Sequence, residues 1–158
     1  MRTLLIALIF NGALLRTGWA TLSPPIEIPV TITQGTSVRV PFSVPRSGTY
    51  DLMLQYRARV DTYDNRILNL KLRRELAGTV TLSCDGRTLK HKLPTGWGRA
   101  LPGRVITVIA RFRAKAQKTY VCSLRITHLP SGVPHKALLG LIYVTPYFHP
   151  GNRVYELQ

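Results

Sequence analysis

Histidines and carboxylates are the side chains that could carry acid–base or metal chemistry in this sequence, and their spacing supports neither. The seven acidic residues are scattered, so no pair can be assigned as a general acid and a general base. The sequence contains no G-x-S-x-G nucleophile elbow and no phosphate-binding loop. No H-x-x-E-H or H-x-H motif includes any of the histidines, which are His91, His128, His135 and His149. We therefore expect no catalytic residue, no metal site and no cofactor.

Arginine is the second chemically informative residue type, with 16 arginines among the 22 basic residues. The guanidinium group binds carboxylates and phosphates through a planar fork and is favoured over lysine at interfaces. In G-W-G-R a tryptophan stands beside an arginine, and both residue types are common interface anchors. The predicted binding surface comprises Arg57, Arg59, Trp97, Arg99, Arg111 and Arg113. Two alternatives remain: charge that protects strand edges from aggregation, and a Trp97 that stacks on a sugar ring or covers the core.

The N-terminus has the pattern of a secretory signal peptide. A basic start at Met1–Thr3 precedes an apolar run over residues 4–15, and Gly18-Trp19-Ala20 provides small residues for cleavage. The apolar run is shorter than the ~20 residues that a membrane-spanning helix needs. We predict a signal peptide over residues 1–20, a periplasmic or secreted location, and no transmembrane segment in the mature chain. An uncleaved anchor or a buried N-terminal helix is the alternative.

The net charge of +15 favours an anionic partner. Removing residues 1–20 takes away Arg2 and Arg16 and no acid, which leaves a strongly basic mature chain. For an exported protein the candidate partners are an acidic protein and an anionic envelope component, either glycan or lipid. Nucleic acid, the first expectation for a cytoplasmic protein of this charge, is not expected after export. Alternatively, the charge serves solubility alone.

The two cysteines, Cys84 and Cys122, are expected to form a disulfide. Cys84 continues the alternating apolar face of residues 79–84, and Cys122 that of residues 119–126, so both side chains are predicted to point into the core. An even pair in an oxidising compartment favours a bridge, which would stabilise the fold by about 4 kcal/mol in the chain-entropy model. Two buried free thiols are the alternative. Without nearby histidine pairs, these cysteines do not make a zinc site.

The chain reads mainly as β-strands. About eight segments are predicted as strands, and apolar residues alternate with polar ones in most of them: residues 26–32, 38–44, 49–59, 79–84, 88–93, 105–113 and 119–126. The last segment, residues 137–144, is apolar on both faces, as expected for a central strand. We predict an all-β fold, an antiparallel β-sandwich of jelly-roll or immunoglobulin-like type, forming one domain over residues 21–158. Residues 40–58 are predicted to form a hairpin around Pro45–Gly48, and Asp85-Gly86 is a second hairpin turn. Residues 94–104 are expected to form a long loop.

Residues 61–77 are the one segment with a helical pattern. Leu68, Leu72 and Leu76 recur every four residues, with Asp64 as a candidate N-cap and Gly78 as the residue after the helix. Leucines at positions 68, 70 and 72 also alternate, so a strand over residues 65–77 is the competing interpretation. We prefer a short helix packed across the end of the sandwich.

The segment P-F-S-V-P-R-S-G-T-Y-D-L-M-L-Q-Y resembles the hairpin of small exported β-sandwich domains of unknown function from Gram-negative bacteria. The resemblance covers about residues 26–145, and its motifs are structural. Carbohydrate-binding modules share this hairpin pattern. Some such bacterial domains are linked to contact-dependent antagonism as periplasmic immunity proteins, so the resemblance implies that role as an expectation. It assigns no functional residue.

Together these features predict a non-enzymatic periplasmic binding protein that engages an acidic protein partner, with a role as an immunity protein against a secreted toxin as the expected use. The first alternative is a binding module for an anionic envelope glycan or lipid. The second is a hydrolase whose site forms only by tertiary contact, with a histidine near Asp61, Asp64 or Glu75.

Overall fold

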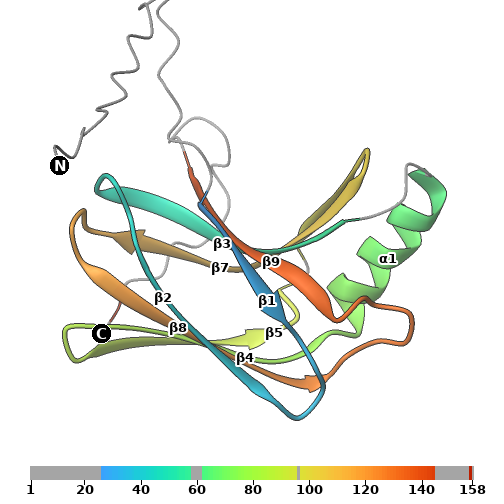
Figure 1. Cartoon of the computed structure of the whole chain (residues 1–158), viewed down its shortest axis with the longest axis horizontal. Coiled ribbons are helices and arrows are strands. Elements are labelled where there is room, and N and C mark those ends of the chain that lie inside the picture. Colours follow the sequence, from blue (N-terminus) through green and yellow to red (C-terminus); the bar gives the residue numbers. More distant parts are fainter. Residues whose placement is uncertain (1–25, 58–61, 96, 145–156, 158) are drawn as a thin grey trace, which may run out of the picture.

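The structure, a computed structural model, describes residues 26–57, 62–95, 97–144 and 157. Two antiparallel sheets pack face to face in this part of the chain (Figure 1). The first sheet has the order β1 (Ile26–Thr31), β9 (Lys136–Tyr143), β3 (Gly48–Arg57), β7 (Arg104–Ala114) and β6 (Gly98–Leu101). The second has the order β2 (Ser37–Ser43), β8 (Thr119–His128), β4 (Ala77–Cys84) and β5 (Arg87–Leu93). The predicted all-β sandwich is confirmed. The predicted signal peptide and Arg59 lie outside the described residues.

The strand order is that of a jelly roll. The chain changes sheet at every connection between consecutive strands except β4–β5 and β6–β7. As a result, strands distant in sequence become neighbours, and β9 lies between β1 and β3. The first two strands of an immunoglobulin-like sandwich share one sheet, whereas β1 and β2 lie in different sheets here, so the order is that of a jelly roll.

The predicted hairpin over residues 40–58 is wrong. β2 pairs with β8, whereas β3 pairs with β7 and β9, so the Pro45–Gly48 turn connects the two sheets. Phe42 and Tyr50 are nevertheless both buried, because they reach the same core from opposite sheets. Alternation of apolar residues specifies which face of a strand is buried, but not which strand lies beside it.

The Asp85-Gly86 hairpin is confirmed. Cys84 pairs with Arg87 across a two-residue turn, and both turn residues have positive φ, 49° at Asp85 and 77° at Gly86. Two positive φ angles define a type I′ turn, whose twist matches that of paired strands. Within the predicted loop at 94–104, however, β6 pairs with β7 and extends the first sheet.

Aromatic rings fill the core between the two sheets. Phe42 and Tyr120 stack with centroids 5.6 Å apart, and Phe112 meets Tyr120 edge to face at 5.7 Å. Tyr50 contacts Phe112 from the adjacent strand. These rings come from both sheets and hold them together near the turns that connect β2 to β3 and β7 to β8.

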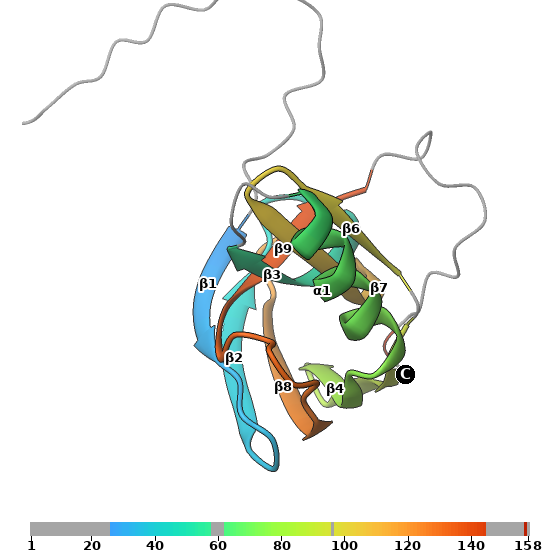
Figure 2. The ribbon, with the colours of Figure 1, turned by 90° about the vertical axis from the view of Figure 1, so that its right-hand side faces the viewer.

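The preferred helix is confirmed as α1 (Thr62–Arg74), which lies at one end of the sandwich against β6 and β7 (Figure 2). Leu72 and the following Leu76 are fully buried, and Leu68 packs against the core. Asn65 Nδ2 donates to the Leu101 carbonyl at 3.2 Å, and Asn69 Nδ2 to the Ile106 carbonyl at 3.4 Å. Apolar packing and these two bonds together fix the helix on the sheet.

The predicted helix boundaries are wrong by a few residues. Asp64 lies within the first turn of α1, and Gly78 belongs to β4. A Cβ added at Gly78 would lie 2.2 Å from the Arg125 carbonyl oxygen, so the glycine allows β4 and β8 to approach closely. In the part of the chain that the structure describes, no helix is both long and apolar enough to cross a membrane.

Candidate anion-binding cleft

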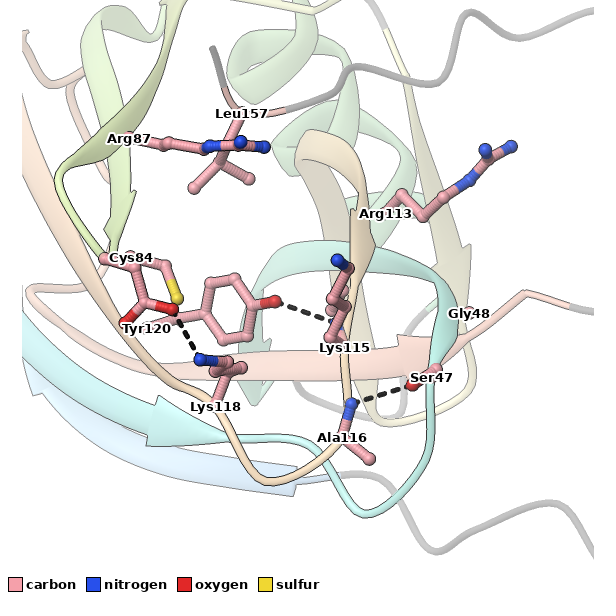
Figure 3. Close-up of a pocket in the computed structure, with 12 residues that line it drawn as sticks. Ser47, Gly48, Cys84, Arg87, Arg113, Lys115, Ala116, Lys118, Tyr120 and Leu157 are labelled. Atoms are coloured by element: carbon pink, nitrogen blue, oxygen red, sulfur yellow. Dashed lines mark hydrogen bonds and ion pairs between the residues drawn. The ribbon is translucent and has the colours of Figure 1, made fainter.

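Three turns meet at the end of the sandwich opposite α1 (Figure 1), because the jelly-roll order brings the β2–β3, β4–β5 and β7–β8 connections to the same end. Residues of these turns line a cleft of about 1150 Å³ (Figure 3). The lining residues are Ser47, Gly48, Cys84, Asp85, Arg87, Arg113, Ala114, Lys115, Ala116, Lys118, Tyr120 and Leu157.

The lining of the cleft is strongly basic. Four exposed cations, Arg87, Arg113, Lys115 and Lys118, surround one carboxylate, Asp85, which gives a net charge of +3. Lys118 Nζ lies 2.7 Å from Asp85 Oδ2. This hydrogen bond lowers the pKa of Asp85 below its ordinary value and raises that of Lys118. A concave surface with this excess of cations attracts anions.

The inner wall of the cleft is held in place by hydrogen bonds. Tyr120 is buried, and its hydroxyl accepts a hydrogen bond from the Lys115 N–H at 2.8 Å. Burial raises the pKa of Tyr120, so the phenol stays neutral at ordinary pH. The Ala116 N–H donates to Ser47 Oγ at 2.9 Å, which ties the β7–β8 turn to the β2–β3 turn (Figure 3). The cations at positions 115 and 118 are therefore carried on an anchored turn.

The predicted disulfide is not present, and Cys84 and Cys122 are free thiols. Leu82 is the register partner of Cys122, so Cys84 lies two residues further along β4. Diagonal neighbours on adjacent strands are about 7–8 Å apart, beyond the roughly 4.4–6.8 Å between Cα atoms that a disulfide spans. Cys84 is half-buried in the cleft wall, whereas Cys122 is buried in the core, where burial raises its pKa to about 12.

The predicted arginine surface is divided between the two ends of the first sheet. Arg113 pairs with Thr49 and lines the cleft, whereas Arg57 pairs with Arg104 at the far end of the same ladder. Eight residues of strand separate the two positions, a distance of roughly 26 Å. Arg99 is exposed on β6. Arg113 therefore lines the cleft, whereas the other described residues of the predicted surface are not among the lining residues.

Arg111, predicted to face a partner, is instead buried with 5% exposure. Its Nε and Nη2 donate to the two carboxylate oxygens of Asp51, its register partner on β3, at 2.6 and 2.8 Å. The half-buried Trp97 ring lies 5.5 Å from the Arg111 guanidinium. Arg111 thus has a structural role, because an acid on the neighbouring strand and the segment before β6 enclose it.

Sequence reasoning missed three of the cations in the cleft, Arg87, Lys115 and Lys118. They lie in or beside turns, where charged residues are ordinarily solvated. The two lysines of K-A-Q-K, at positions 115–118, are the feature of the sequence that could have indicated a basic site. Their position beside the Asp85-Gly86 turn follows only from the strand order. Within the described ranges, no three histidine, cysteine or acidic side chains lie together as metal ligands.

Comparison with known proteins adds information about the fold. No family model matches the chain, and no curated protein matches it. A solved protein from Sulfurospirillum deleyianum is similar with a TM-score of 0.53 and 11% identity, over 78% of this chain and 99% of its own. The P-domain of Penaeus vannamei nodavirus has a TM-score of 0.32 and 8% identity, over 79% of this chain and 100% of its own. The bacterial likeness is one of fold alone, and the class defined here is a jelly-roll β-sandwich with a basic cleft.

Proposed function

We propose that this protein is a non-enzymatic binding protein that engages an acidic protein partner through the basic cleft. The observation that carries the proposal is the grouping of Arg87, Arg113, Lys115 and Lys118 around a cleft whose lining includes one carboxylate. That carboxylate, Asp85, is already paired with Lys118. An incoming anion therefore meets a net positive lining, and arginine can bind a carboxylate through two parallel hydrogen bonds.

Protein carboxylates fit this lining better than a sugar ring does. Sugar recognition commonly uses an exposed aromatic face, and the lining described here contains one aromatic residue, Tyr120, which is 4% exposed. Trp97, the predicted stacking residue, lies over Arg111 rather than among the lining residues. An acidic segment of a protein is accordingly our first choice of ligand.

Binding would proceed in two stages. The strongly positive charge of the chain, +15 over the full sequence including Arg2 and Arg16, and the local charge of the cleft accelerate the encounter with an acidic surface, an effect that salt weakens. Docking at the cleft then covers the partner's acidic surface. We propose neutralisation of a secreted toxin as the use of this binding. The signal-peptide pattern and the resemblance to exported domains support this role in the periplasm or outside the cell.

The proposal is tested by a pull-down from the protein's own cell envelope, at about physiological salt and again at high salt. The cleft variant is Arg87→Glu/Lys115→Glu. The control is Lys90→Glu/Lys92→Glu, which makes the same charge change at two exposed positions of β5 outside the cleft. We expect the native and control proteins to retain one acidic protein that the cleft variant loses.

Three other outcomes would overturn the proposal. Equal loss in both variants would indicate a general charge effect with no defined site. Equal retention would place the partner elsewhere on the protein. Recovery of lipid or glycan alone would favour the envelope-binding alternative. If the cleft is confirmed, a test of whether the recovered protein is toxic, and whether binding blocks that toxicity, decides the immunity role.

A further inference from the structure

Leu157 places an aliphatic side chain inside the basic cleft. It is among the lining residues, it is half-buried, and it packs against the hydrophobic core. In Figure 3 its side chain points into the cleft on the side of Arg87. Leu157 is distant in sequence from the three turns that carry the cations. Its side chain therefore enters the cleft from a separate segment of the chain.

The position that Leu157 fills has an apolar wall. Ala114, the ring of Tyr120 and the half-buried Cys84 contribute carbon and sulfur atoms to the lining, whereas the cations are exposed. Tyr120 is buried and Cys84 is half-buried, whereas Arg87 and Lys115 are exposed at the opening of the cleft. The cleft thus combines an apolar part with a cationic rim, and an anion alone would use only the rim.

We propose that the cleft recognises an aliphatic side chain carried next to a carboxylate, and that Leu157 fills the aliphatic position until a partner displaces it. This inference rests on the proposed function of the cleft and specifies the partner's chemistry. The sequence around Leu157 matches that chemistry, since Glu156 precedes it. A half-buried leucine gains only part of the transfer free energy of full burial, so a partner residue that fits more closely can replace it.

Cys84 provides a direct reporter of access to the apolar position. It is half-buried in the cleft wall, whereas Cys122 is 1% exposed and, with its pKa raised to about 12, is a poor nucleophile at neutral pH. The experiment measures the rate at which the full-length native protein reacts with a neutral reagent, iodoacetamide, and with an anionic one, dithiobis-nitrobenzoate. The second reagent forms a mixed disulfide with Cys84 and releases a coloured thiolate.

We expect Leu157→Ala to raise the rate of Cys84 labelling several-fold with both reagents. The matched control is Leu70→Ala, which shortens a leucine that is 45% exposed on α1, at the other end of the sandwich, and leaves the rate unchanged. Arg87→Gln/Lys115→Gln should slow only the anionic reagent. An unchanged rate in Leu157→Ala would overturn the inference that this leucine occupies the cleft.

A peptide tests the two-part recognition. Acetyl-R-V-Y-E-L-Q-amide, which copies residues 153–158, should slow the labelling of Cys84 in the Leu157→Ala protein. Peptides with alanine for the leucine, or glutamine for the glutamate, should protect less. If the alanine peptide protects as well as the unaltered one, the cleft does not recognise the aliphatic side chain. If the glutamine peptide does so, the cleft does not recognise the carboxylate. If Leu157→Ala has no effect while the cleft charge variant still loses its partner in the pull-down, this inference fails and the proposed function stands.

Discussion

Asp51 and Arg111 lie opposite each other on β3 and β7 and form a buried bidentate ion pair, with N–O distances of 2.6 and 2.8 Å. The pair links two neighbouring strands of the first sheet, β3 and β7. The turns that connect these strands to β2 and β8 border the cleft. Its two hydrogen bonds satisfy both carboxylate oxygens, so the charges are compensated within the protein. Arg111, which the sequence suggests as a binding residue, therefore stabilises the fold.

Removing one partner of this pair should destabilise the fold strongly. Asp51→Leu leaves the Arg111 guanidinium buried without its anion, at a cost of about 3–5 kcal/mol in the free energy of unfolding. The double variant Asp51→Leu/Arg111→Met removes both charges and should recover most of that loss. Urea unfolding of the native protein, the single variant and the double variant measures both effects. A double variant that is less stable than the single one would contradict this account.

The cysteines should titrate as two free thiols of unequal reactivity. Without reductant, the native protein should react much faster at Cys84 than at Cys122, because the latter is buried and its pKa is raised to about 12. In denaturant both thiols should react. A thiol-counting assay in the two conditions checks this, with Cys84→Ser as the control that removes the fast reaction. No reactive thiol in denaturant would mean that the cysteines are bridged after all.

The Asp85–Lys118 ion pair should give a small dependence of stability on pH. Because the folded pKa of Asp85 is lowered, its contribution is present above the ordinary carboxyl pKa of about 4 and is lost as pH falls through the folded pKa. Because the pKa of Lys118 is raised, its contribution is present below about 10.4 and is lost as pH rises through the folded pKa. Both groups are exposed, so salt should weaken the effect.

Titration of the Asp85 carboxyl by NMR tests this pair directly. Lys118→Met should raise the pKa of Asp85 toward its ordinary value, since the hydrogen bond from Lys118 is the largest cause of the lowering. Lys115→Met is the matched control, and it should raise that pKa less, because Lys115 acts through its charge without a hydrogen bond and contributes least to the lowering. Equal rises in the two variants would show that general positive charge, and not the ion pair, lowers the pKa.

Gly78 and Gly140 should differ in their tolerance of alanine. A Cβ at Gly78 would lie 2.2 Å from the Arg125 carbonyl oxygen, a backbone atom that cannot move without disturbing the β4–β8 ladder. At Gly140 it would lie 2.3 Å from Gln55 Nε2, the end of a side chain that can rotate away. We expect Gly78→Ala to lower the free energy of unfolding by about 1–3 kcal/mol or more, and Gly140→Ala by less. Thermal unfolding ranks the two, and the reverse order would contradict the close approach of β4 to β8 at Gly78.

The local elements of this protein follow from its sequence alone. Period-two alternation marks the strands, because a strand with one buried face must place apolar residues at every second position. Asp85-Gly86 predicts its hairpin, since both residues tolerate the positive φ angles of a type I′ turn. The leucines at 68, 72 and 76 predict α1 because they share one face of a helix. The excess of positive charge is likewise a property of composition.

Tertiary structure alone decided which of these elements meet. The partner strands of β2 and β3, the two-residue offset between Cys84 and Cys122, and the enclosure of Arg111 by Asp51 all depend on pairing between residues distant in sequence. Local periodicity carries no information about such pairing, because any two half-buried strands can share a core in several orders. The cleft depends on the same pairing, since the jelly-roll order gathers three turns at one end of the sandwich, where Leu157 also lines the cleft.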